Sequence, residues 1–300
     1  SMHISHFNKW ISYLLLRPSN LMKILKLGQM LGGSNAPSGA SGLVNKYSLD
    51  FDGVDDILIT TEDATIMPTD NLTVGCWIKP STWAFTGNGQ IQFSFGCVQS
   101  GGYGLAFANN YNATVTTFKS IIRVSDTGSL SAGYLEPSAG TGFSSTLRAL
   151  TGWHYVALTY EKATGVASLS LDGVEKGTAN AAAGADLVYH PTNNVPLMFG
   201  ADASTDTTGQ NFFDGNIDEG SVWNKALSSA ELVAVYNSGV PIDLLTDAGD
   251  YASSSNLQGW WRNGDTGGAS VYPTITDDSS NSNDGTMTNM DSGDIVTDVP

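Results

Sequence analysis

Apolar and polar residues alternate along most of the chain after residue 46, which is the pattern of half-buried β-strands. The alternation is clearest in residues 47–51, 72–78 and 153–160. Weaker strand-like runs cover residues 57–59, 90–98, 103–108, 115–125, 166–171, 174–177, 196–200 and 257–262. Strands do not alternate with long helical segments, so we do not expect a parallel sheet. The pattern predicts an all-β fold, a two-sheet antiparallel jelly-roll sandwich.

A short helix is predicted between Ser228 and Gly239, directly after a strand that begins at the Asp214-Gly215 turn. Ser228 is a preferred N-cap residue, and Glu231 three residues later completes the sequence of a capping box. Gly239 can adopt the left-handed conformation that ends a helix. Its apolar residues form one narrow face, so we expect this helix to dock on the sandwich.

A second helical signal lies near the N-terminus. Apolar residues within residues 7–31 cluster at helical spacing on both sides of Pro18, and the first 32 residues hold four basic residues and no acidic ones. Such amphipathic helices could lie on a membrane surface, pack on their own domain or dock on a partner chain. We favour the partner chain, because an exposed apolar element needs cover.

The composition divides the chain into three parts. Residues 1–31 are predicted to be a basic amphipathic helical arm, residues 32–46 a Gly/Ser-rich flexible linker, and residues 47–300 the jelly roll with a C-terminal extension. A net charge of −16 over 300 residues argues against nucleic acid as a partner. There is no apolar run of 18 residues or more, so we expect no membrane-spanning helix.

The two cysteines, Cys76 and Cys97, both fall in predicted strands. A single cross-strand disulfide is possible, and two buried thiols are the alternative that we favour, because two cysteines do not make a disulfide framework.

Several short stretches, taken in order, are similar to those of one family. They are residues 49–56, 72–80, 152–157 with 171–173, and 214–219 with Trp223-Asn224 and Leu227-Ser228. Together they resemble the laminin-G-like jelly-roll domains of the concanavalin A-like lectin/glucanase superfamily, over roughly residues 47–240. Residues 260–262 and 278–286 resemble a segment that often precedes the Phe-Asp-Gly strand in such domains. The tail is therefore expected to be a permuted order or to complete the same sheet.

The resemblance requires a test for catalysis, because this superfamily includes glucanases. Its glucanases carry a Glu-x-Asp-x-x-Glu run on one strand, and here Asn216 stands in place of the first Glu. Asp218 and Glu219 are adjacent, so we expect them to point to opposite faces of the strand. A Ser-His-Asp order or a metal-binding pair of histidines does not stand out either. We predict that the chain is not an enzyme.

Calcium is the predicted cofactor, because it takes oxygen ligands from loops. Asp52, Asp55 and Asp56 surround the first turn, and Asp218 lies in the later strand. The resemblance implies a calcium ion at the edge of the sandwich. The alternative is that these acids only form turns.

Carbohydrate binding would use aromatic rings and polar side chains in loops. The candidates are Trp83, Phe85, Tyr103, Asn110, Tyr111 and Tyr134. Each of them could instead be a packing residue.

The domains that this chain resembles occur in secreted multidomain proteins, in polysaccharide-processing systems and in structural proteins of bacteriophages and other viruses. A basic arm on an acidic jelly roll is most similar to the last group. We therefore predict a non-enzymatic structural or adhesion protein of a virus particle, specifically a bacteriophage, located in the virion. The jelly roll would face outward to contact glycans or a host surface, and residues 7–31 would anchor it to other virion subunits in a homo-oligomer.

The alternatives are a free-standing, calcium-dependent carbohydrate-binding lectin module, which would be extracellular, and a polysaccharide-cleaving enzyme. The arm separates the first alternative from the virion protein, because a lectin module does not need residues 7–31 for assembly.

Overall fold

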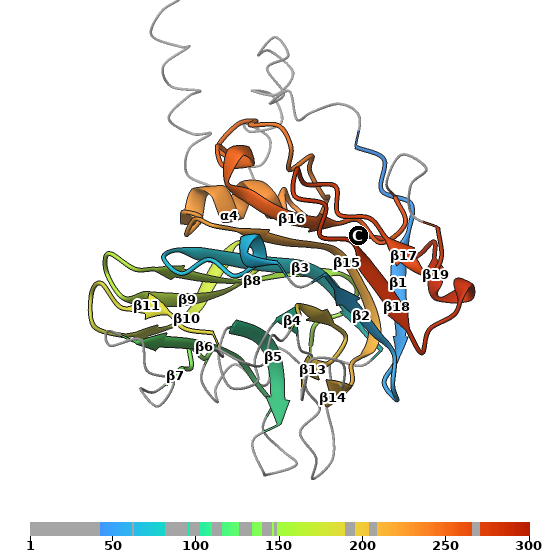
Figure 1. Cartoon of the computed structure of the whole chain (residues 1–300), viewed down its shortest axis with the longest axis horizontal. Coiled ribbons are helices and arrows are strands. Elements are labelled where there is room, and N and C mark those ends of the chain that lie inside the picture. The colour runs from blue at the N-terminus through green and yellow to red at the C-terminus, as the bar shows by residue number, and fades with distance from the viewer. Residues whose placement is uncertain are drawn as a thin grey trace, which may run out of the picture. The chain divides into compact units, whose positions relative to one another are not determined.

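Two antiparallel sheets pack face to face in the computed structural model (Figure 1). It describes residues 43–61, 63–81, 95–96, 103–109, 116–125, 134–139, 146, 149–189, 196–203, 209–265 and 271–300. All of these lie in one compact unit of the chain, Ala40–Pro300. The predicted all-β, antiparallel architecture is thus confirmed for this unit.

Within the described part of the chain, sheet A contains eight strands, in the order β10-β9-β8-β3-β15-β1-β19 with β16 beside β15. In chain order they are β1 (Ser48–Asp52), β3 (Leu72–Pro80), β8 (His154–Glu161), β9 (Val166–Leu171), β10 (Val174–Asn180), β15 (Asp214–Trp223), β16 (Leu257–Trp261) and β19 (Ile295–Val296). The strongest alternating runs of the sequence therefore form the centre of this sheet.

Sheet B contains nine strands among the residues that the structure describes, in the order β11-β6-β5-β4-β12-β2-β18-β17 with β7 beside β6. They are β2 (Ile57–Thr60), β4 (Phe95–Gly96), β5 (Tyr103–Asn109), β6 (Thr116–Ser125), β7 (Tyr134–Leu135), β11 (Asp186–Leu187), β12 (Met198–Phe199), β17 (Thr274–Ile275) and β18 (Gly285–Thr288). A separate pair joins β13 (Asp202–Ala203) and β14 (Gly209–Gln210). Short 3-10 turns are η1 (Ala64–Ile66), η3 (Ser254–Asn256) and η4 (Ser292–Asp294).

The main core fills the space between the two sheets. In β3, Leu72, Val74, Cys76 and Ile78 point into it, whereas Trp77 belongs to a second apolar cluster. This alternation follows from the two-residue period of a strand. Cys76 is a free, buried thiol, and burial raises its pKa well above the usual range. Cys97 lies outside the described residues.

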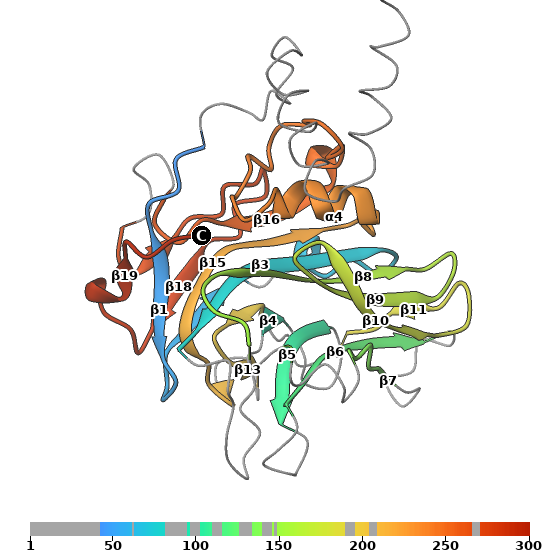
Figure 2. The ribbon, with the colours of Figure 1, turned by 180° about the vertical axis from the view of Figure 1, so that it is seen from behind.

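The helix α4 (Ser229–Tyr236) covers the other face of sheet A, which we call the outer face (Figures 1 and 2). Its predicted capping box is present: the Ser228 hydroxyl accepts from the Glu231 backbone, and the Glu231 carboxylate accepts from the Ser228 backbone. The helix ends earlier than predicted, because Asn237 already adopts the left-handed conformation with φ of 42°. Asparagine tolerates this conformation better than most residues.

The second apolar cluster lies between α4 and the outer face of sheet A. Its buried members are Trp77, Tyr155, Ala157, Trp223, Leu227, Leu232, Val235, Leu244, Tyr251, Leu257 and Trp260. The sandwich is therefore covered on this face by a third layer, which is why Trp77, Trp223 and Trp260 are nearly fully buried.

The C-terminal tail completes both sheets rather than one. In sheet A, β16 pairs with β15 and β19 pairs with β1, whereas β18 pairs with β2 in sheet B. Figure 2 shows β18 and β19 on either side of β1, at the same end of the molecule.

The predicted arm, residues 1–31, lies outside the described residues, as do residues 32–42. Residues 43–46 of the predicted linker are bound to the sandwich. The Val44 carbonyl accepts a hydrogen bond from Arg262 at 3.0 Å, and the Asn45 amide donates to Asp218 at 2.9 Å. The ordered domain therefore includes Leu43 to Lys46, because buried polar groups hold this segment in place.

Candidate functional site

The acidic residues of β15 lie where this strand changes its partner. On one side β3 pairs along nearly the whole strand, and on the other side β1 pairs with residues 214–217 and β16 with residues 220–223. Between these two partners the register against β3 shifts, from Asp218 opposite Trp77 to Ser221 opposite Gly75. One extra residue is therefore present, as in a β-bulge.

The bulge turns Glu219, with φ of 51°, onto the outer face beside Asp218. The expectation that the two acids point to opposite faces is therefore wrong. Strict alternation fails here because the extra residue breaks the two-residue period. Gly220 completes the bulge, since a Cβ there would lie 2.0 Å from the Phe199 ring in the main core.

Glu219 is buried in a network with the C-terminal segment. Its Oε2 accepts from the Trp260 indole at 2.6 Å and its Oε1 accepts from Arg262 Nε at 3.2 Å. The Arg262 guanidinium also lies over the Trp260 ring, 5.1 Å from its centroid. Burial raises the pKa of Glu219 to about 7, although Arg262 and Trp260 oppose this rise.

Asp218 is fully buried and has no cation as its partner among the described residues. Its carboxylate accepts from the Asn45 side chain at 2.9 Å and from the Glu219 backbone at 2.8 Å. Burial, and then the charge of Glu219, raise its pKa well above the usual range. A carboxyl group in this setting is favoured in its protonated form.

Two buried amide oxygens lie in the segments that meet Asp218. The side-chain oxygens of Asn45 and Asn263 have no hydrogen-bond partner among the described residues. Asn263 uses its amide nitrogen to donate to the Ile217 carbonyl at 2.7 Å, at the point where β1 stops pairing with β15. This junction therefore has spare acceptors and lacks donors, and a proton on Asp218 or a buried water would supply one.

The other predicted calcium ligands form a separate group at the turn between β1 and β2. Asp52, Asp55 and Asp56 each offer a carboxylate oxygen, and these oxygens lie within 4.8 Å of one another. Asp218 is not part of this group. Asp52 is opposite Asp214, four residues before Asp218, which is about 13 Å along a strand. The structure therefore places three of the four predicted calcium ligands together at the turn and Asp218 apart from them.

Backbone groups shape this turn. Asp52 Oδ1 accepts from the Val54 amide at 2.7 Å and from the Asp55 amide at 3.4 Å, and Asp56 Oδ2 accepts from the Asp52 amide at 3.0 Å. Gly53 has φ of 74° and lies against Asp214, so a side chain would not fit there. These contacts bring the three carboxylates to one side of the turn.

The turn lies in a strongly acidic part of the surface. Burial raises the pKa of Asp56 to about 6, and the charges of Asp52, Asp294 and Asp55 add to the rise. The pKa of Asp50, which precedes the turn in β1, is also raised by burial and then by nearby carboxylates. A divalent cation would relieve this repulsion, and oxygen ligands of this kind suit Ca²⁺.

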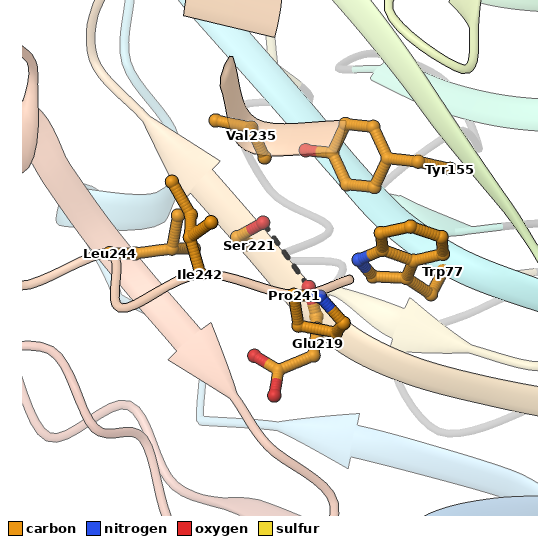
Figure 3. Close-up of a pocket in the computed structure, with 8 residues that line it drawn as sticks. All are labelled: Trp77, Tyr155, Glu219, Ser221, Val235, Pro241, Ile242 and Leu244. Carbon is orange, nitrogen blue, oxygen red and sulfur yellow. Dashed lines mark hydrogen bonds between the residues drawn. The ribbon is translucent and has the colours of Figure 1, made fainter. Parts of the chain in front are cut away.

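A small pocket beside Glu219 lies under α4 (Figure 3). It is lined by Trp77, Tyr155, Glu219, Ser221, Val235, Pro241, Ile242 and Leu244. The Ser221 hydroxyl donates to the Glu219 carbonyl at 3.3 Å. The pocket has room for roughly one water molecule, so a sugar ring cannot enter it.

The predicted carbohydrate ligands are mostly outside the described residues. Trp83, Phe85, Asn110 and Tyr111 lie there, and only the backbone of Tyr134, in β7, is described. Tyr103 is fully buried in the main core, where its hydroxyl donates to the Ile66 carbonyl at 2.7 Å. Its ring therefore has no face open to a sugar, and this prediction is corrected.

The sequence did not single out Asn45, Arg262 or Asn263 as parts of a site. Arg262 carried a signal, because a cation next to the apolar pair Trp260-Trp261 has to find a buried partner. Asn45 carried none, since it lies in a segment rich in Gly, Ser and Asn.

The sequence matches the family Laminin_G_3, described as the concanavalin A-like lectin/glucanases superfamily, over residues 52–233. This is more than half of the chain. The chain belongs to this superfamily. The match ends within α4, so the C-terminal strands that complete both sheets lie beyond the part that defines the laminin-G-like domain. No curated protein matches the sequence.

Solved structures are similar to this one. A proposed carbohydrate-binding protein from Bacteroides ovatus ATCC 8483 has 13% identity and a TM-score of 0.55, and the match covers 82% of this chain and 59% of that protein. The CBM40 domain of the Ruminococcus gnavus IT-sialidase, bound to α2,3 sialyllactose, has 18% identity, a TM-score of 0.44, and coverage of 64% and 97%. At such identities the similarity concerns the fold alone.

None of the described helices is long and apolar enough to cross a membrane.

Proposed function

We propose that this chain is a non-catalytic carbohydrate-binding protein. The observation that carries the proposal is its membership of the concanavalin A-like lectin/glucanases superfamily, over residues 52–233. Its similarity to the Bacteroides ovatus protein, which is itself a proposed carbohydrate-binding protein, supports the same function. Of the predicted sugar ligands, Trp83, Phe85, Asn110, Tyr111 and Tyr134 remain candidates.

The geometry of the acidic pair supports the absence of catalysis. A retaining glycosidase needs two carboxyl groups about 5–5.5 Å apart that flank the scissile bond from an open groove. Asp218 and Glu219 are both buried, and Glu219 is occupied by Arg262 and Trp260. Two carboxyl groups that substrate cannot reach do not cleave it.

A glycan array tests this proposal directly. The full chain should bind some of the arrayed glycans, because the superfamily to which it belongs includes lectins. Incubation of the same glycans with the protein should release no sugar. Binding to no glycan by folded protein would contradict carbohydrate binding, and released sugar would contradict the absence of catalysis.

We further propose that the domain is displayed on a virus particle, specifically a bacteriophage, and that residues 7–31 anchor it to other subunits. The distribution of charge supports this division, since the first 32 residues carry no acid although the net charge is −16. A basic, amphipathic segment on an acidic domain suits attachment to a partner. The alternative remains an extracellular lectin module that works alone.

A variant that begins at Leu43 tests the anchor. It keeps the segment that contacts Asp218 and Arg262, so its melting temperature should match that of the full chain. Light scattering should show an oligomer for the full chain and a monomer for the variant. The same number of subunits in both would exclude the anchoring role.

We also propose that Ca²⁺ binds at Asp52, Asp55 and Asp56. The three converging carboxylate oxygens and the raised pKa of Asp56 support this site. An ion there would hold the turn between β1 and β2, one strand of each sheet, and so would stabilise the sandwich.

A further inference from the structure

A row of polar side chains crosses the outer face of sheet A. Asp50 of β1 is opposite Asn216 of β15, and Asn216 is opposite Lys79 of β3. Asp298, which follows β19, lies on the same face, because its carbonyl accepts from the Ser48 hydroxyl at 2.6 Å. The side chains of Lys79 and Asp298 are 35% and 45% exposed, so the row can be reached from solvent.

An aromatic side chain borders this row. Trp153 directly precedes β8, whose first residue, His154, is opposite Ile78 of β3. The Trp153 indole donates to Asp298 Oδ1 at 3.0 Å, and the Lys79 ammonium is paired with Asp298 Oδ2. One carboxylate therefore fixes both the tryptophan and the lysine. We call Asp50, Lys79, Trp153, Asn216 and Asp298 the outer polar cluster.

Trp153 is only half-buried and packs against the second apolar cluster. Its indole nitrogen is satisfied by a charged, partly exposed partner rather than by the core. A ring held in this way can present apolar surface to a ligand at little further cost in entropy, because its orientation is already fixed.

The charge of the cluster selects among ligands. The cluster contains the carboxylates of Asp50 and Asp298. The pKa of Asp50 is raised by burial and then by the charges of Asp294 and Asp214 nearby. Among the described residues, Lys79 is the cation paired with the cluster. An excess of carboxylates repels acidic sugars such as sialic or uronic acids. Carboxylates accept hydrogen bonds from the hydroxyls of neutral sugars, and these bonds are stronger than those to uncharged acceptors.

We propose that the outer polar cluster is a binding subsite for a neutral glycan. Trp153 provides the stacking surface, Asn216 and Lys79 donate to sugar hydroxyls, and Asp50 accepts from them. Three of these residues lie on strands of sheet A, which gives the subsite a rigid base. This inference rests on the proposed carbohydrate-binding function and names its ligand class and place.

The test compares full-length variants on the same glycan array, followed by calorimetric titration of the strongest neutral oligosaccharide. Trp153→Ala should weaken its binding at least about tenfold, as expected when an aromatic anchor is truncated. Trp153→Phe keeps a ring but loses the hydrogen bond to Asp298, and it should weaken binding less. Trp83→Ala tests the sugar-ligand candidate outside the cluster, and Lys162→Met, which removes ion pairs with Asp70 and Asp186, is the control that should bind like the wild type.

Each outcome decides a different point. Unchanged affinity in folded Trp153→Ala would overturn the subsite while leaving carbohydrate binding intact, and so would a loss in Trp83→Ala alone. Exclusive binding of sialylated glycans would overturn the neutral ligand class. A blank array with folded wild-type protein would remove the proposed function and the subsite together. If Trp153→Ala does not fold, Lys79→Met and Asn216→Ala take its place, and unchanged affinity in both would overturn the subsite.

Discussion

Replacing Arg262 with Met should lower the free energy of unfolding by about 3–5 kcal/mol at pH 8, because it leaves Glu219 buried without its cation. The guanidinium is the one group that neutralises Glu219 among the described residues, and it also holds Val44 and lies over Trp260. Urea unfolding followed by tryptophan fluorescence measures the change.

The loss should depend on pH in a defined direction. The pKa of Glu219 is raised from 4.5 to about 7, so this group contributes stability below pH 4.5 that is lost as the pH rises through 7. Without Arg262 the pKa rises further. The difference between wild type and Arg262→Met should therefore be small at pH 5 and grow towards pH 8.

Two further variants isolate the cause of the Arg262→Met effect. Adding Glu219→Gln to it should restore much of the stability, since no buried charge then remains unpaired. Lys162→Met removes exposed ion pairs with Asp70 and Asp186 and should cost far less stability than Arg262→Met. A loss in Arg262→Met that is as small as in Lys162→Met, or that is the same at pH 5 and pH 8, would contradict the role assigned to this network.

Excess Ca²⁺ should raise the melting temperature by about 5–10 °C over chelator-treated protein. An ion that binds only the folded state contributes about 2.7 kcal/mol at 100 times its dissociation constant, and a domain of this size gains about 2–4 °C per kcal/mol. Because the pKa of Asp56 is about 6, the shift should shrink as the pH falls below 6, where a proton competes with the ion. Differential scanning calorimetry at pH 7.5 and pH 5 measures both effects.

The matched variants are Asp55→Asn and Asp218→Asn. Asp55 is exposed and its carboxylate forms none of the hydrogen bonds found among the described residues, so the substitution removes a ligand with little other effect. Its calcium-dependent shift should nearly disappear, whereas Asp218→Asn should keep the shift of the wild type. The reverse pattern would place the ion at the buried junction of β1, β15 and β16, and no shift in the wild type would exclude calcium binding.

The capped helix shows how far local signals reach. Ser228 and Glu231 are three residues apart, and both halves of their capping box are present as predicted. Such a motif needs only one helical turn, so neighbouring residues decide it. The strands of sheet A follow from the same kind of evidence, because apolar alternation in β3 and β8 is a property of each segment alone.

Tyr103 and Asp218 show where the sequence does not suffice. Tyr103 has the composition of a sugar ligand, and only its contact with Ile66, 37 residues away, shows that it is a core residue. The sequence groups Asp218 with Asp52 because both could offer a carboxylate oxygen to calcium. Strand pairing then places Asp52 opposite Asp214, which separates the two.

The sequence by itself determined the all-β class, the capped helix, the acidic surface and the superfamily, since these depend on composition, period and short motifs. Tertiary structure alone decided the bulge at Glu219, its pairing with Arg262, the separation of the acidic turn from Asp218, and the meeting of Trp153 with Lys79 at Asp298. The reason is that strand pairing joins residues separated by 40 to more than 200 positions. A register shift of one residue changes the face on which every later side chain lies.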